Sequence, residues 1–177
     1  MRITSTSTIL RRPEPRDVAQ LYIYRNDPEV TDLLGGFSNG YSAADLTEWI
    51  DFHRKKSDEV IWVIADQAKD LCLGHVGLYN IDNRIRKAEF AIMIGDKASW
   101  GCGLGTSVSR DVINYGFEQL NLHRIELEVL SYNARAIRLY QKLGFRQEGI
   151  LRDAQFRHGG YVDVVKMGLL EHERNWG

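Results

Sequence analysis

The chain has few of the residues that mark several large classes of protein. Its 177 residues include two cysteines, Cys72 and Cys102, which lie far apart in the sequence. This count excludes a disulfide framework and favours the reducing environment of the cytoplasm. The five histidines show no spacing typical of metal ligands, so we expect neither a structural nor a catalytic metal.

An excess of one charge and a long apolar run are also lacking. Lysine and arginine number 23 against 24 acidic residues, and the formal net charge is -1. Without a basic stripe we expect no nucleic-acid partner. No apolar run approaches the ~20 residues of a membrane-spanning helix. Residues 1–15 lack the apolar core of a secretory signal, so we expect no membrane association. The length suits a single domain over residues 1–177.

Hydrophobic periodicity and turn residues predict an α/β (α+β) fold. A mixed, mostly antiparallel central sheet of about seven strands would carry helices on both faces. Residues 27–42 are rich in turn formers and are expected to be irregular, and Ser42 is expected to cap a helix that ends at Lys55. The other expected helices are 15–24, 106–120 and 131–143. The expected strands are 3–10, 59–65, 71–80, 88–94, 123–129, 145–156 and 161–170.

The most informative segment is the glycine-rich loop after the fourth expected strand. Residues 100–106 read Trp-Gly-Cys-Gly-Leu-Gly-Thr, and an expected helix follows at once. Glycines let a backbone approach a ligand closely, and exposed amides at a helix start favour an anion. The loop lacks the lysine of a P-loop, and its glycines are too closely spaced for a dinucleotide fingerprint. It therefore predicts a general phosphate cradle, with a plain strand-to-helix turn as the alternative.

A second motif follows in residues 133–145, which read NARAIRLYQKLGF. Together with the glycine loop, this segment resembles the GNAT superfamily of N-acetyltransferases, in its RimJ/RimL-like or spermidine-acetyltransferase-like branch. The likeness covers nearly the whole chain and implies the GNAT fold. The positions that match the family pattern of the second segment are Asn133, Ala136, Tyr140, Gly144 and Phe145.

The resemblance implies an acetyl-CoA-dependent N-acetyltransferase in which a primary amine attacks the acetyl group directly in a ternary complex. A polyamine, an amino sugar and a peptide or protein N-terminus remain open as acceptors. Spermidine enzymes carry acidic clusters in the loop between the first two helices, whereas this loop offers only Asp27, Glu29 and Asp32. A non-catalytic acyl-CoA-binding module on the same fold is the alternative. Edge strands of this fold often pair, which suggests a homodimer.

Residue roles follow from the same resemblance. Tyr140 is the expected proton donor to the leaving sulfur, and its alternative is a plain core aromatic. Glu89 is the expected general base, ahead of Glu126 and His75. Trp100 stands where the family usually has Gln or Arg, and its role is open. The expected cofactor-binding residues are Ile92, Met93, Ile94, Trp100, Gly101, Cys102, Gly103, Leu104, Gly105, Thr106, Asn133, Arg135 and Lys142. The expected acceptor-binding residues are Leu34, Phe37, Tyr41, Glu89, Arg152 and Phe156.

Overall fold

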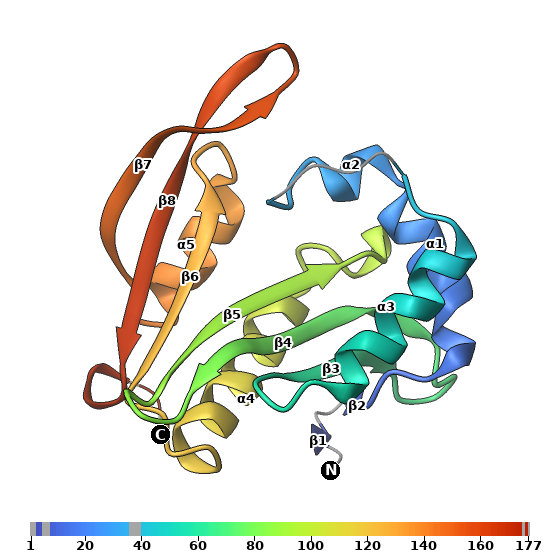
Figure 1. Ribbon diagram of the computed structural model, residues 1–177, viewed down its shortest axis with the longest axis horizontal. Helices are drawn as coiled ribbons and strands as arrows, with labels where there is room; N and C mark the ends of the chain where they lie inside the picture. The colour runs from blue at the N-terminus through green and yellow to red at the C-terminus, as the bar shows by residue number, and fades with distance from the viewer. Residues whose placement is uncertain (1–2, 5–7, 36–39, 175, 177) are drawn as a thin grey trace.

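The computed structural model of the protein describes residues 3–4, 8–35, 40–174 and 176. Its strands are β1 (Ile3–Thr4), β2 (Thr8–Arg11), β3 (Val60–Asp66), β4 (Cys72–Asp82), β5 (Lys87–Ile94), β6 (Arg124–Leu130), β7 (Arg146–Arg157) and β8 (Gly160–Leu170). They form one sheet in the order β1-β2-β3-β4-β5-β6-β8-β7 (Figure 1). All neighbours run antiparallel except β5 and β6, which are parallel. The expected mixed, mostly antiparallel sheet is confirmed.

Helices cover both faces of this sheet (Figure 1). The first and third helices pack over a core cluster that contains Met93 of β5, and the fourth and fifth pack over a larger cluster that contains Phe90. Met93 and Phe90 of β5 therefore point to opposite faces of the sheet, each into a different core cluster. Within the described ranges, no helix has both the length and the apolar character of a membrane span. The helices are α1 (Val18–Arg25), α2 (Pro28–Thr31), α3 (Ala43–Lys55), α4 (Leu104–Glu118) and α5 (Ala134–Lys142), with short 3₁₀ turns at Pro15–Asp17, Lys97–Ser99 and Glu171–Glu173.

Two expectations about local structure are wrong. The expected single strand over residues 3–10 is two antiparallel strands, because Ile3 pairs with Leu10. Alternating apolar residues do not reveal such a reversal without a glycine or proline to mark it. The region 27–42 contains the short helix α2, which Asp27 caps by accepting the N–H of Glu29. One helical turn is too short to show a hydrophobic period.

The strand β5 is paired along both edges for only part of its length. Its residues 87–89 lie beside β6, whereas its other edge follows β4 to the end of the strand. Beyond that point β6 stays paired with β8 over its whole length. The sheet therefore splits between β5 and β6.

The backbone groups at this split can be assigned from the hydrogen bonds of β4. The Gly95 N–H donates to the Leu73 carbonyl at 2.9 Å, which continues the register between β4 and β5. Alternation along an antiparallel pair then turns every second residue of β5 toward β4. Beyond the residues paired with β6, the remaining groups are the Phe90 carbonyl and the N–H and C=O groups of Ile92 and Ile94, and these face the split.

A buried ion pair fixes the start of α1 against the sheet. The Arg11 guanidinium donates to both carboxylate oxygens of Asp17, at 2.8 and 2.7 Å, and to Asp70 at 2.6 Å. Arg11 is 8% exposed and Asp17 is 2% exposed. Since Asp70 lies in the turn between β3 and β4, this one side chain connects β2, α1 and that turn.

We predict that Asp17→Asn lowers the free energy of unfolding by about 3 kcal/mol, because it leaves the buried charge of Arg11 poorly compensated. Denaturant unfolding followed by circular dichroism measures the loss. The control is Asp51→Asn, which removes an exposed pair with Arg54 at 3.8 Å. That change should cost less than about 1 kcal/mol. Equal losses in the two variants would contradict the prediction.

Candidate active site

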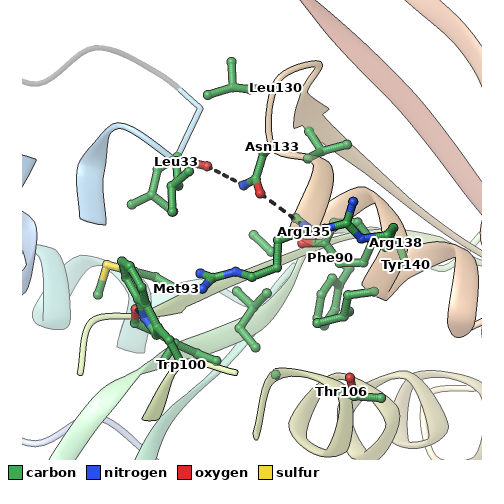
Figure 2. A pocket seen from close by; sticks show the side chains of 18 of the residues that line it. Leu33, Phe90, Met93, Trp100, Thr106, Leu130, Asn133, Arg135, Arg138 and Tyr140 are labelled. Atoms are coloured by element: carbon green, nitrogen blue, oxygen red, sulfur yellow. Dashed lines mark hydrogen bonds between the residues drawn. The ribbon is translucent and has the colours of Figure 1, made fainter. Parts of the chain in front are cut away.

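A cavity of about 760 Å³ fills the split between β5 and β6 (Figure 2). Its walls come from β5, the glycine loop, the start of α4, the end of β6 and α5. The structure thus brings together most of the residues expected to bind the cofactor. Cys102 is exposed and Leu104 packs against the core, and neither lines the cavity. Those that do are Ile92, Met93, Ile94, Trp100, Gly101, Gly103, Gly105, Thr106, Asn133, Arg135 and Lys142.

The glycine loop presents an uncovered backbone to this cavity. Gly101 and Gly103 have φ angles of 78° and 82°, in the left-handed region that favours glycine. A Cβ atom at either position would meet no other atom of the described chain within 4 Å. Gly103 is also the N-cap of α4, so the free amides of that helix begin at the loop. This arrangement suits a phosphate group.

Trp100 links the glycine loop to the two neighbouring elements. Its indole Nε1 donates to the Ile94 carbonyl at 2.9 Å, so it pairs one of the backbone groups at the split. The guanidinium of Arg135 lies over the Trp100 ring, 4.5 Å from its centroid. Figure 2 shows these two side chains beside each other. A cation over an indole face is a favourable contact. Trp100 therefore holds the end of β5, the loop and α5 together, a role that the sequence left open.

Asn133 joins the start of α5 to the loop after α2. Its Oδ1 accepts the Ala136 N–H at 3.1 Å, and its Nδ2 donates to the Leu33 carbonyl at 3.2 Å (Figure 2). Asn133 is the N-cap of α5. Gly144, with φ of 83°, follows the last turn and ends the helix.

Three cations of α5 line the cavity. Arg135 and Lys142 were expected there, and Arg138 was not. All three are exposed, and they lie at helical spacing on one face of α5. That spacing is the signal in the sequence that could have identified Arg138.

Tyr140 lies at the buried end of the cavity, where it is 8% exposed. Its ring makes edge contacts with Phe90 and Phe145, with centroids 6.2 and 5.8 Å apart. Burial raises the pKa of its hydroxyl, so the phenol stays protonated in the physiological range. No described residue forms a hydrogen bond with that hydroxyl. A proton donor is thus available inside the cavity.

A second cavity, of about 550 Å³, lies on the opposite face of the sheet, under α1 and α3. Its floor carries Glu89 and Met93 of β5 and His75 and Tyr79 of β4. Between these pairs the small residues Gly77 and Ala91 lie opposite each other, and the ring of Tyr79 lies against Gly77. Both cavities are lined by residues 90–93, Leu34, Gly35 and Glu128. The two cavities therefore meet through the split in the sheet.

The carboxylates of the second cavity differ in their partners. Glu89 is exposed and makes no hydrogen bond or ion pair with any described residue. Glu126 is buried and bound by Lys87 at 2.9 Å and Arg124 at 3.0 Å. Burial alone would raise the pKa of Glu126, but these hydrogen bonds outweigh it and lower that pKa. Glu128, which the sequence did not single out, is exposed where the two cavities meet.

Most of the other residues expected to bind the acceptor do not line either cavity. Leu34 lines both cavities, whereas Tyr41 lines neither. Arg152 and Phe156 are exposed on the hairpin of β7 and β8, which projects from the body of the molecule (Figure 1), and they also line neither cavity. Phe37 lies outside the described residues. The roles of these residues stay predictions. Across the described ranges, no group of three or more metal-ligating side chains occurs.

The family model described as Acetyltransferase (GNAT) domain matches residues 8–146. The chain belongs to the GNAT acetyltransferase family. It is an N-acetyltransferase that uses acetyl-CoA as its acetyl donor. The resemblance drawn from the two sequence motifs, to an acetyl-CoA-dependent N-acetyltransferase of the GNAT superfamily, is thereby confirmed.

Individual relatives agree with this assignment. A spermidine N(1)-acetyltransferase of Vibrio cholerae is 35% identical over 163 residues, which cover 92% of each chain. A putative ribosomal N-acetyltransferase of Bacillus subtilis is 32% identical and covers 93% of this chain and 91% of its own. Among solved structures, spermidine N-acetyltransferase from Vibrio cholerae in complex with CoA and spermine superposes with a TM-score of 0.85 at 29% identity, covering 96% of this chain and 98% of the other.

The cavity of this acetyltransferase fits CoA by its own features. The glycine loop offers backbone amides to the pyrophosphate, and the cations of α5 surround the same mouth. The unpaired edge of β5 offers backbone partners to an extended chain that carries amide groups. These parts are the ones that a phosphate-bearing, amide-containing donor requires.

We predict that Gly103→Val weakens acetyl-CoA binding about tenfold or more, because a side chain would cover amides that must approach the pyrophosphate. Isothermal titration calorimetry measures the change. Gly159→Val is the matched control, since Gly159 has a φ of 79°, has open space at its Cβ position and lies in a hairpin turn away from both cavities. It carries the same backbone strain. A comparable loss of affinity in both variants would mean that strain, and not the cradle, explains the effect.

Proposed function

We propose that the protein acetylates a primary amine that enters from the face under α1 and α3, while acetyl-CoA binds from the face of α4 and α5. The observation that carries this proposal is the junction of the two cavities along residues 90–93. An amine in the second cavity can reach an acetyl group in the first without crossing intact sheet. This geometry supports direct attack in a ternary complex.

The reaction then needs two proton transfers and one oxyanion donor. When bound, acetyl-CoA supplies an acetyl group on a thioester. The amine nitrogen bonds to the acetyl carbon, the carbon–sulfur bond breaks, and the sulfur takes a proton. We assign the oxyanion donor to the backbone N–H groups of Ile92 and Ile94, which face the split. Met93 turns its backbone groups toward β4 and contributes only to the walls.

Tyr140 is the proposed acid that protonates the sulfur. Its hydroxyl lies in the first cavity without a hydrogen-bond partner among the described residues, and its raised pKa keeps it in the donor form. A phenol can donate a proton and also bind a sulfur atom.

We predict that Tyr140→Phe lowers kcat about 100-fold, because the leaving sulfur loses its proton donor. Release of the free thiol from acetyl-CoA measures the rate. Affinity for acetyl-CoA should change by no more than about threefold, since only the hydroxyl is lost. Tyr115→Phe, on a helix position that lines neither cavity, is the matched control and should retain full activity. An unchanged kcat in Tyr140→Phe would exclude Tyr140 as the acid.

Glu89 is the proposed base. A base must accept a proton, and Glu89 has no cation bound to its carboxylate, whereas Glu126 is bound by two. His75 is buried, and burial lowers its pKa well below the usual range, which makes it a weak base. Glu128 shares the exposure and the location of Glu89 at the cavities, and it is the residue against which Glu89 must be tested.

We predict that Glu89→Gln lowers kcat/KM about 100-fold at neutral pH, because an amide cannot accept the proton that the attacking amine loses. Glu128→Gln changes the other exposed carboxylate of the second cavity and should stay within about threefold of the wild-type rate. Steady-state rates of thiol release measure both variants. If Glu128→Gln loses the activity and Glu89→Gln keeps it, then Glu128 is the base.

The acceptor itself stays open between three classes. Relatives named spermidine N-acetyltransferase support a polyamine. Against a polyamine, the acidic residues in the segment between α1 and α3 already form ion pairs within the chain. Lys97 lies 2.8 Å from both Asp27 and Glu29, and His158 lies 2.5 Å from Asp32. An amino sugar and a peptide N-terminus therefore stay beside the polyamine. A cytoplasmic location and a homodimer also stay predictions.

A further inference from the structure

Arg25, at the end of α1, is a cation in the second cavity without a counter-charge. It lines that cavity and is partly buried, and no described carboxylate forms an ion pair with it. The residues outside the described ranges include no Asp or Glu side chain. A charge removed from water normally carries an ionic or hydrogen-bonding partner. Arg25 therefore has binding capacity that the chain itself does not use.

The surroundings of Arg25 hold the guanidinium in place. Its Nη2 lies 3.1 Å from Nε2 of His75, and its Cζ lies 5.4 Å from the ring centroids of both Tyr41 and Trp49. Arginine can only donate, so Nε2 of His75 accepts and the imidazole proton is on Nδ1. That Nδ1 is buried without a hydrogen-bond partner among the described residues. The same wall thus has a fixed guanidinium and a second unused donor.

One acidic side chain of this cavity is already occupied, since Glu59 is held by His53 and lies 3.8 Å from Lys56. Glu89, by contrast, has no ion-pair partner among the described residues, and it lies opposite Tyr79 in the register of β4 and β5. Tyr79 lies four positions after His75 in β4, about 13 Å along the strand. One cavity therefore has an unpaired anion and an unpaired cation at two ends of its floor.

We infer that the acceptor is an amine that also carries an anionic group, a carboxylate or a phosphate, which binds Arg25. The amine then lies toward Glu89 and the split in the sheet. A planar guanidinium binds either anion through two parallel hydrogen bonds. A polyamine, by contrast, would bring a second cation against Arg25. This inference rests on the proposed function, because it takes the second cavity as the acceptor site.

Acceptors of equal length and different charge test the inference. With acetyl-CoA, wild-type protein should use ε-aminocaproate better than its amide or hexamethylenediamine, by on the order of tenfold or more in kcat/KM. Glucosamine and its phosphate monoester form a second pair, which tells a phosphate ligand from a carboxylate ligand. The anionic member of at least one pair should be preferred.

Variants of Arg25 tie the preference to this side chain. Arg25→Gln should remove the preference by raising KM for the anionic acceptor on the order of ten- to a hundredfold, with KM for acetyl-CoA unchanged. Arg25→Lys should restore part of it, and Arg25→Glu should reverse the order in favour of the diamine. Arg110→Gln removes an exposed arginine that lines neither cavity and should keep the wild-type order. Melting temperatures show whether each variant is folded.

Two results would overturn the inference. Wild-type protein could use the diamine as well as or better than every anionic acceptor, or the preference could persist in folded Arg25→Gln. In either case the acetyltransferase activity and the proposed function stand. Binding of acetyl-CoA without turnover of any primary amine would overturn the proposed function together with the inference.

Discussion

The strand β5 is hydrogen-bonded along both edges only at residues 87–89, and the rest of the site depends on this partial pairing. Backbone N–H and C=O groups in a protein interior require partners. At the split, the Ile94 carbonyl obtains one from Trp100, while the Phe90 carbonyl and the backbone groups of Ile92 face the cavity. An interior sheet edge without a strand beside it is a binding site for an extended ligand that can pair with it. The fold creates this edge by keeping β6 paired with β8 while β5 follows β4.

The local parts of this arrangement were predictable from the sequence. The glycine loop and the segment 133–145 have strong local signals, because a positive φ at Gly103 and Gly144 and a cap at Asn133 each require particular residue types. The expected strand 123–129 corresponds to β6, and its alternating apolar residues Ile125, Leu127 and Val129 lie in the core. These features depend on residues close together in the chain.

The parts that could not be predicted depend on contacts between distant elements. The split between β5 and β6 is a property of strand pairing and leaves no mark in the composition of either strand. Glu126, a weaker candidate for the base, is buried with Lys87 and Arg124 as partners, and these contacts cannot be inferred from its own strand. Arg25 lines the second cavity because α1 meets β4 at His75, fifty positions later in the chain. The chain reversal between β1 and β2 was also not predicted, because it is defined by the pairing of Ile3 with Leu10.

The two cavities open on opposite faces of the sheet, and this has a consequence for the order of events in turnover. A ligand in one mouth does not block the path of a ligand in the other. With CoA in the first cavity and the amine in the second, as we propose, CoA can leave while the acetylated amine is still bound, and the amine product can leave while CoA is still bound. The architecture imposes no obligatory sequence of arrival or departure, so any order seen in steady-state kinetics must come from coupling between the sites and not from obstruction of one exit by the other ligand.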